Sequence, residues 1–169
     1  MNNMVYPLGQ VLEVKNKRVE DAEKVWKEKL QLLAKEEEKL KQAEAERDKV
    51  LKHQQDKLKQ LRDELSHATT SPKVQQMKVY LKVCAEKLQI EEKKVADQKE
   101  QVNIAKRNVD EAKKDLDRKR LDVDKIKTHQ NDWEKEKRKE LEIIEGREQD
   151  ELGGSIFLNK MQTKKALKS

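Results

Sequence analysis

The chain has 169 residues, of which 44% are Asp, Glu, Lys or Arg, 34% are hydrophobic and 3% are aromatic. An ordinary globular domain has about 25% charged and about 45–50% apolar residues, so this chain cannot fill a broad three-dimensional core. Its four Gly and two Pro residues are too few for the turns of an all-β or α/β fold. The composition therefore favours extended helices.

The net charge of +6 comes mostly from the end of the chain, where Lys160, Lys164, Lys165 and Lys168 follow Glu151 without a further acid. Basic and acidic residues alternate through the rest, a pattern typical of solvated helix faces with ion pairs along the helix. Nucleic-acid binding needs a stripe of unpaired cations, so we expect none by the helical body. The basic tail is the one argument for a nucleic-acid-binding arm.

Targeting and membrane signals are missing from the sequence. A single Cys cannot form an intramolecular disulfide, and the first ten residues, MNNMVYPLGQ, have no basic and apolar regions of a secretory signal. The apolar run at residues 156–158 is far shorter than the ~20 residues of a membrane span. We expect a soluble, intracellular chain without membrane insertion.

A heptad repeat organises the second half, which has no Gly or Pro between Lys73 and Glu145. Steps of seven residues meet eight apolar side chains in a row: Val74, Leu81, Leu88, Val95, Val102, Val109, Leu116 and Val123. The positions three residues further on are Met77, Cys84, Glu91, Gln98, Ala105, Ala112, Lys119 and Ile126. A sustained a/d repeat of this kind predicts a left-handed coiled coil with a partner helix.

The first half supplies the partner helix, with a weaker seam. Its d positions are Leu12, Val19, Trp26, Leu33, Leu40, Arg47, Gln54, Leu61 and Ala68. Its a positions include Leu30, Glu37, Glu44, Leu51, Leu58 and Leu65, and Ala43 and Val50 widen the stripe by one position.

A turn separates the two halves, because Pro72 would cost about 3 kcal/mol inside a continuous helix but starts a helix well behind a Ser cap. The prediction is an all-α fold, a long antiparallel two-helix coiled-coil hairpin with a longer second helix. In this hairpin residue i lies near residue 141 − i, so that Arg47 could pair with Glu91, and Gly153-Gly154 stops the second helix. The expected segments are a lead-in (1–9), first helix (10–68), turn (69–72), second helix (73–152) and basic tail (153–169).

No catalytic or metal site is apparent. The sequence has no Gly-rich phosphate loop, no Cys pair and no nucleophile constellation, and His53, His67 and His129 are far apart in it. We therefore predict no enzyme activity, no cofactor and no metal. Cys84, Trp26 and Trp133 fall on d positions and are interpreted as seam residues.

The informative residues lie at the two ends of the hairpin. Near the loop, Tyr80 falls outside the seam and is expected to be exposed beside Met77. At the other end the second helix overhangs the first and leaves apolar residues without a partner: Ile143, Ile144, Leu152, Ile156, Phe157, Leu158 and Met161. This patch is either an end-cap that folds back or a docking surface.

The run Arg147-Glu148-Gln149-Asp150-Glu151-Leu152 resembles the acidic run that closes the second helix in the YscO/FliJ family of type III secretion and flagellar export. Length and layout also resemble this family, in particular its chlamydial members. Gly153-Gly154 departs from the helix that continues in the family.

The resemblance implies a non-enzymatic stalk or escort protein, a monomer in the bacterial cytoplasm and peripheral at the secretion apparatus, with a role in protein transport and virulence. Its implied partners are the hexameric export ATPase, export chaperones, the export gate and a YscP-like needle-length regulator. The family places the paired termini in the ATPase pore and the loop end at the gate. Protein-interaction residues would then be Ile143, Ile144, Glu148, Asp150, Glu151 and Leu152 at the termini, and Met77 and Tyr80 at the loop. The alternative from another class is a coiled-coil chaperone or scaffold unrelated to an ATPase.

Overall fold

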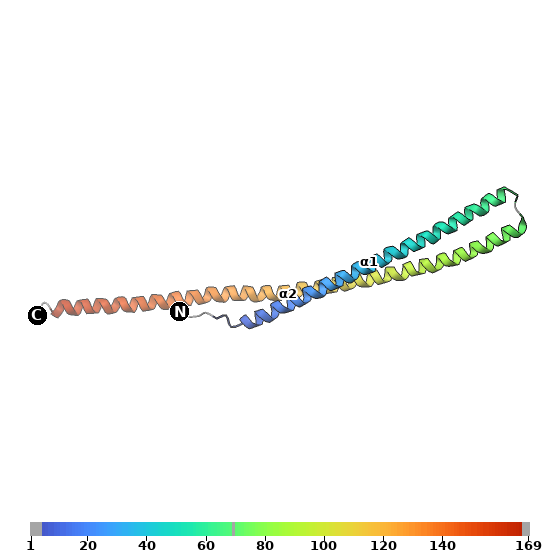
Figure 1. Cartoon of the computed structure of the whole chain (residues 1–169). Coiled ribbons are helices and arrows are strands. Elements are labelled where there is room, and N and C mark those ends of the chain that lie inside the picture. The colour runs from blue at the N-terminus through green and yellow to red at the C-terminus, as the bar shows by residue number, and fades with distance from the viewer. Residues whose placement is uncertain (1–4, 69, 167–169) are drawn as a thin grey trace. The chain divides into compact units, whose positions relative to one another are not determined.

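A computed structural model describes residues 5–68 and 70–166. It contains α1 (Gly9–Ser66, 58 residues) and α2 (Ser71–Ala166, 96 residues), joined by a short turn (Figure 1). No strand occurs in the described ranges, and neither helix there is long and apolar enough to cross a membrane. The predicted all-α helical hairpin with a longer second helix is confirmed.

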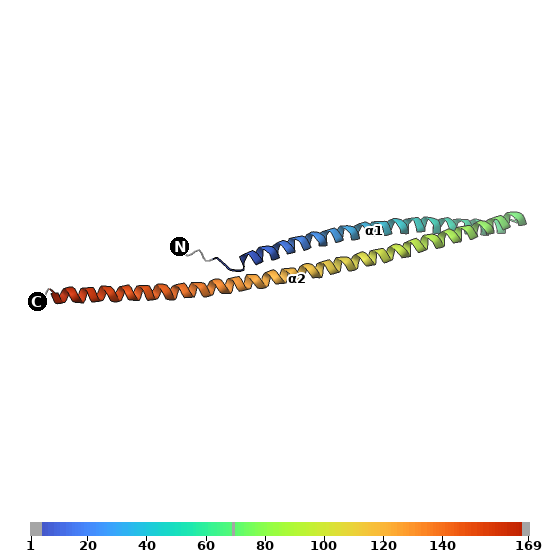
Figure 2. The same cartoon turned by 90° about the horizontal axis from the view of Figure 1, so that it is seen from below.

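Two compact units divide the chain, and each contains segments of both helices. The turn unit is Glu20–Asp117, and the terminal unit comprises Met1–Val19 and Arg118–Ser169. Within the turn unit, α1 and α2 lie side by side in both views (Figures 1 and 2). Within the terminal unit, Lys15 Nζ pairs with Asp122 Oδ2 at 3.1 Å, so the two helices are also in contact there.

The heptad seam of α2 is confirmed along its predicted length. All sixteen a and d positions from Val74 to Ile126 are buried or half-buried. Leu116 is completely buried, and Cys84 and Val95 are each 3% exposed. Since one helix face carries this whole row, the coiled coil consists of a single narrow seam.

The seam of α1 was predicted half correctly. Its d positions from Leu12 to Leu61 are buried or half-buried, as expected. The companion row lies one residue earlier than predicted, three positions after each d residue, and we call it the inner row: Lys15, Ala22, Lys29, Glu36, Ala43, Val50, Lys57 and Glu64. The predicted a positions form what we call the outer row: Glu44 and Leu51 are half-buried, whereas Glu37 is exposed and Leu30 is 37%, Leu58 38% and Leu65 55% exposed.

Small residues favour the inner row at Ala22 and Ala43, although five of its eight residues are charged. Ala22 is small enough to let the helices approach closely and is 5% exposed. In the outer row, Glu37 and Glu44 stay at the flank, where their carboxylates lie 4.0 Å and 3.7 Å from the ammonium groups of Lys106 and Lys99. Burying these carboxylates in the seam would remove them from water, which costs more than such flank pairs contribute.

The turn is placed two residues earlier than expected, because α1 ends at Ser66 and α2 begins at Ser71. Ion pairs between the helices lie on both sides of the predicted sum of 141: Glu64–Lys73 and Lys15–Asp122 sum to 137, and Glu37–Lys106 and Glu44–Lys99 sum to 143. The expected Arg47–Glu91 pair is not formed, since each of these residues pairs within its own helix.

Arg47 instead pairs with Asp48 on its own helix, and Asp48 raises the pKa of the Arg47 guanidinium, first through a hydrogen bond. Glu91 pairs with Lys94. The polar middle of the seam is satisfied in another way, since Gln98 Nε2 donates to Glu36 Oε2 at 2.6 Å and to the Glu36 carbonyl at 3.0 Å.

The turn ends α1 without a glycine. Ala68 has φ of 50°, in the left-handed region that the residue after a helix often adopts. His67 N–H donates to the Glu64 carbonyl, and its Nδ1 lies 2.7 Å from the Asp63 carbonyl oxygen. Val74 N–H donates to the Thr70 carbonyl, so Thr70, rather than Ser71, occupies the N-cap position of α2.

The predicted helix stop at Gly153-Gly154 is wrong. α2 continues through Gly146, Gly153 and Gly154 to Ala166, so residues 153–166 are helical rather than an irregular tail. No described glycine has the positive φ that a glycine C-cap requires. An isolated glycine costs about 1 kcal/mol in a helix, which weakens a helix but does not end it.

Leu116→Ala should destabilise the hairpin by about 2–4 kcal/mol, because it leaves a cavity at a completely buried seam position. Leu121→Ala is the matched control, since Leu121 is 60% exposed, and it should change the free energy of unfolding by less than about 0.5 kcal/mol. Urea unfolding followed by circular dichroism compares the two. Equal losses would contradict the seam described above.

Ala68→Gly should stabilise the hairpin by about 0.5–1 kcal/mol, because it relieves the left-handed strain of an exposed alanine. Ala85→Gly, at an exposed position inside α2, should instead destabilise it by about 1 kcal/mol. Thermal unfolding of both variants would test this. A loss of stability in Ala68→Gly would show that the turn has another backbone conformation.

Candidate protein-interaction surfaces

Chemical groups for catalysis are not gathered anywhere in the described part of the chain. There, no group of three or more His, Cys, Asp or Glu side chains could hold a metal ion. Hydrogen bonds from Lys39 and Gln98 lower the pKa of Glu36, but they tie this carboxylate into the interhelical network. The surfaces that could act are therefore those left uncovered by the seam.

In the terminal unit, an aromatic contact lies just before the start of α1. Tyr6 Oη lies 2.7 Å from His129 Nδ1, and the Tyr6 ring packs edge-on against Trp133 with centroids 5.5 Å apart. Tyr6 is 8% exposed as a result. In the expected pairing of residue i with 141 − i, Trp133 would face Leu8, but its ring contacts Tyr6 instead. Leu141 is the last described residue of α2 that is half-buried.

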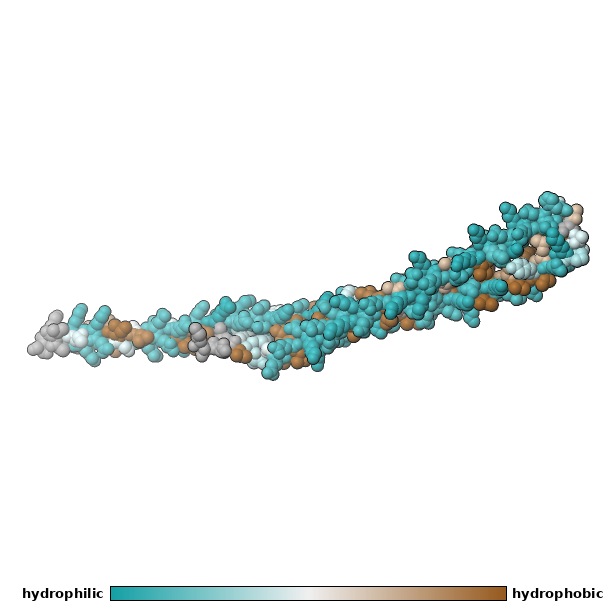
Figure 3. Space-filling model, in the orientation of Figure 1, coloured by the Kyte–Doolittle hydropathy of each residue, from teal (hydrophilic) through white to brown (hydrophobic). Residues whose placement is uncertain are grey.

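The helical extension, residues 142–166 of α2, follows this contact. Every residue whose side chain is described there, from Glu142 to Lys164, is exposed. Seven large apolar side chains in it are between 48% and 63% exposed: Ile143, Ile144, Leu152, Ile156, Phe157, Leu158 and Met161. Figure 3 shows apolar residues near the end of α2 without cover on the face in view. The extension does not fold back, so the alternative of an end-cap is wrong.

The apolar residues surround the extension rather than line one face. Ile156, Phe157 and Leu158 are consecutive, and successive residues of an α-helix point about 100° apart. A helix that packs on one partner shows a single apolar stripe, whereas a helix that is apolar all round is enclosed on several sides. This segment therefore has the surface of an enclosed helix, although nothing in the described chain covers it.

Charges along the extension are segregated. Glu148, Asp150 and Glu151 lie in its first half, and Glu148, Glu151 and Leu152 line a shallow hollow together with Ser155. Lys160 and Lys164 follow in its second half, while the predicted contribution of Lys168 lies outside the described residues. Because these groups are on a continuous helix, the acidic and basic parts are held apart along one axis.

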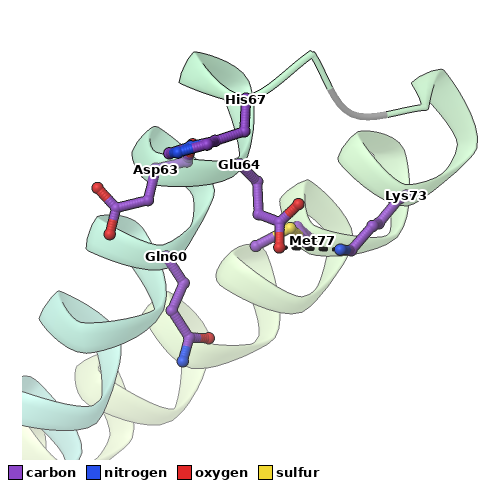
Figure 4. A pocket seen from close by; sticks show the side chains of 6 residues that line it. All are labelled: Gln60, Asp63, Glu64, His67, Lys73 and Met77. Carbon is purple, nitrogen blue, oxygen red and sulfur yellow. Dashed lines mark hydrogen bonds and ion pairs between the residues drawn. The ribbon is translucent and has the colours of Figure 1, made fainter.

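The hairpin tip, residues 57–83, is the second uncovered surface. A hollow of about 560 Å³ separates the ends of the helices (Figure 4), and it is lined by Gln60, Asp63, Glu64, His67, Lys73 and Met77. One ion pair closes it, between Lys73 Nζ and Glu64 Oε1 at 2.8 Å. Four of its six lining residues are exposed, so it is an open hollow at the end of the hairpin.

Tyr80 stands outside the seam, as predicted, and is 43% exposed. Its hydroxyl lies 2.9 Å from His53 Nε2, and Lys57 Nζ lies 5.9 Å from the centre of its ring. In the expected pairing of residue i with 141 − i, His53 would lie opposite Leu88, but it contacts Tyr80 instead. Tyr80 and Met77 line one smaller hollow with Lys57, Gln60 and Gln76, so the two predicted loop-end residues are brought together.

The prediction from sequence missed part of the extension. Ile156, Phe157 and Leu158 were noticed as unpaired apolar residues but were assigned to an irregular tail because of Gly153-Gly154. The absence of Pro after Pro72 was the available signal that a helix could continue. Ile143, Ile144 and Leu152 lie on the same continuous helix. The predicted helix end and the predicted tail therefore form one surface.

The chain is a coiled-coil hairpin protein, with two long helices that share one seam and with uncovered ends. The model of the YscO-like protein family matches residues 3–163. The chain belongs to the YscO-like protein family of type III secretion, which confirms the resemblance seen in the sequence.

Two solved structures are similar to the chain. One is a YscO homolog, CT670 from Chlamydia trachomatis, with 44% identity and a TM-score of 0.88 over 94% of this chain and 99% of that one. The other is a chain in the Chlamydia pneumoniae CdsV and CdsO complex, with 50% identity and a TM-score of 0.48 over 50% of this chain and 98% of that one. No curated protein matches the chain significantly.

Trp133→Ala should loosen the start of the hairpin, because it removes the ring that packs on Tyr6. Amide exchange at residues 9–13 should become about tenfold faster, which corresponds to about 1.4 kcal/mol of lost local stability. Ile144→Ala, an exposed substitution in the extension, is the control and should leave exchange at these residues unchanged. Unchanged exchange in Trp133→Ala would contradict an anchoring role for the aromatic contact.

Proposed function

We propose that this chain is a non-enzymatic stalk of a type III secretion export apparatus and that it binds and regulates a hexameric export ATPase through the helical extension. The family and the resemblance in the sequence support the choice of partner. ATP would be hydrolysed by the ATPase, and this chain would act by binding. The location would be the bacterial cytoplasm, at the base of the apparatus.

The observation that carries the proposal is the all-round apolar surface at Ile156, Phe157 and Leu158. A groove on one partner covers one stripe of a helix, so it would leave at least one of these side chains in water. A ring with a central pore surrounds a helix and can cover all three. Burying a large apolar side chain contributes about 1.5–3 kcal/mol, so this cluster would provide much of the binding free energy.

Segregated charges suit entry into a ring. Acidic groups at Glu148, Asp150 and Glu151 precede the apolar cluster, and basic groups at Lys160 and Lys164 follow it. Charges at a rim accelerate encounter and orient a partner, whereas the buried apolar contacts determine how long the complex lasts. Ile143, Ile144 and Leu152, in the first half of the extension, would contact the entrance of the pore.

The hairpin tip would serve the other partners that the resemblance implies, namely the export gate, export chaperones and a YscP-like regulator. Tyr80 is half-exposed with a hydroxyl and a ring face available near Lys57, and Met77 lines the adjacent hollow. Tyr and Met are frequent at interfaces because they give large contact areas that adapt to a partner.

Deleting residues 142–169 should abolish stimulation of the ATPase while the hairpin stays folded. Replacing Ile156, Phe157 and Leu158 by Ser should weaken binding by about 100-fold or more, because it removes the apolar cluster without shortening the helix. Turnover of the ATPase and pull-down measure the effect, and circular dichroism checks helix content.

Val79→Ser is the matched control, since Val79 is 65% exposed and lies outside the extension. Tyr80→Ala with Met77→Ala should spare ATPase binding and impair binding of the gate or chaperones. If the deletion still stimulates turnover and the tip variant does not, the orientation is reversed. If neither variant changes turnover, the chain is not a stalk, and the coiled-coil chaperone or scaffold takes its place.

A further inference from the structure

In the turn unit, α1 carries two rows of side chains that compete for the same seam. Both rows stand next to the d positions, and the inner row lies three residues and the outer row four residues after each of them. In the outer row of this unit lie Glu23, Leu30, Glu37, Glu44, Leu51, Leu58 and Leu65. The centre of a seam lies midway between the d row and its companion row. The two companion rows are about 100° apart around the helix, so exchanging one for the other rotates the helix by about 50° about its axis.

The two halves of α1 in this unit favour different rows. Far from the turn, the inner row has the alanines Ala22 and Ala43, and the outer row has Glu37 and Glu44, which pair with lysines of α2 at the flank. Near the turn the preference reverses, because the inner row has Lys57 and Glu64. At the same level the outer row has three leucines at heptad spacing: Leu51, Leu58 and Leu65.

The structure keeps the inner row in the seam along the whole unit, which leaves a conflict near the turn. Leu58 is 38% and Leu65 55% exposed there, while the charged Lys57 and Glu64 are half-buried. The hollow of about 560 Å³ at Glu64 and a smaller one beside Val50 and Cys84 lie between the same stretches of helix. Leu58 and Leu65 are exposed while Lys57 and Glu64 are half-buried, which indicates that local sequence and global packing disagree near the turn.

We propose that the tip half of α1, residues 47–66, is a two-position element that rotates by about 50° between the observed seam and one that buries Leu51, Leu58 and Leu65 against α2. The d row stays in the seam in both positions, so the helices need not separate. The interactions that hold the observed position are partly exposed: the Glu64–Lys73 pair, the His53–Tyr80 hydrogen bond and the Lys57–Tyr80 contact. Partly exposed contacts of this kind are weak.

Rotation exchanges the surface that the tip presents. In the observed position the flank shows leucines, and in the rotated one it shows Lys57 and Glu64, with Tyr80 released from His53. A partner that prefers one of these surfaces would shift the population between the positions. The element rests only on contacts inside the turn unit and does not depend on the proposed ATPase.

The chain's own Cys84 can report the position. Gln98 donates a hydrogen bond to Glu36 across the seam at 2.6 Å. Two heptads closer to the turn on both helices, the residues in the corresponding positions are Cys84 and Val50. Both of these residues line the same hollow, and Cys84 is 3% exposed. A Val50→Cys variant should therefore form a disulfide with Cys84 only in the observed position, and its equilibrium constant with glutathione measures the population of that position.

Two double substitutions move this equilibrium in opposite directions. In the Val50→Cys parent, Glu37→Leu with Glu44→Leu makes the outer row continuous and should lower the disulfide constant by about fivefold. Adding Leu58→Lys with Leu65→Lys to that variant removes the leucines that favour the rotated position and should return the constant to within about twofold of the parent. Val25→Lys with Leu32→Lys is the matched control, since both residues are exposed on α1 in neither row, and it should leave the constant unchanged.

The proposal is overturned if the parent forms no Val50–Cys84 disulfide, if Glu37→Leu with Glu44→Leu leaves the constant within about twofold of the parent, if adding Leu58→Lys with Leu65→Lys does not reverse the loss, or if the control pair lowers the constant as much. Circular dichroism verifies that each variant keeps its helix content. The single changes Glu37→Leu and Glu44→Leu, each expected to act in the same direction, replace the double variant if that one does not fold.

Discussion

A two-helix hairpin has only one seam, and this constraint determines most of the molecule. Each helix can bury about two of every seven residues against a single partner. α2 meets the constraint with an uninterrupted row that includes the completely buried Leu116. α1 has apolar residues on more than two rows, so some of them must remain in water whichever row is buried. Exposed leucines and valines are therefore a consequence of the architecture and need no separate cause unless they cluster.

Polar side chains decide which row of α1 enters the seam. Lys99 and Lys106 hold Glu44 and Glu37 at the flank, and Gln98 satisfies Glu36 inside it. Each such contact contributes little stability, but together they disfavour a rotation of the helix. Near the turn this selection weakens, because Lys57 and Glu64 occupy the seam positions that leucines could fill. The choice of the α1 row that enters the seam is thus strongly determined far from the tip and weakly determined at the tip.

Both uncovered surfaces follow from where the seam stops. In the terminal unit, the contact of Tyr6 with Trp133 is followed by an extension in which every described side chain is exposed. In the turn unit, hollows separate the helices around Met77 and Tyr80. An all-round apolar helix and an adaptable tip suit different partners, an enclosing one and a flat or grooved one.

The sequence by itself determined the hairpin, the seam of α2 and the uncovered positions of Ile143, Ile144 and Tyr80, because heptad spacing and the place of Pro72 depend on local geometry alone. Only the tertiary structure decided three other features. It selected the inner row of α1. Both rows repeat every seven residues, so the period does not distinguish them, and only their contacts with α2 do. It placed the turn two residues earlier, since α1 ends at Ser66 and Ala68 then turns the chain without a glycine. It carried α2 past Gly153-Gly154, because a glycine ends a helix only where the backbone adopts a left-handed cap, and spacing does not reveal that choice.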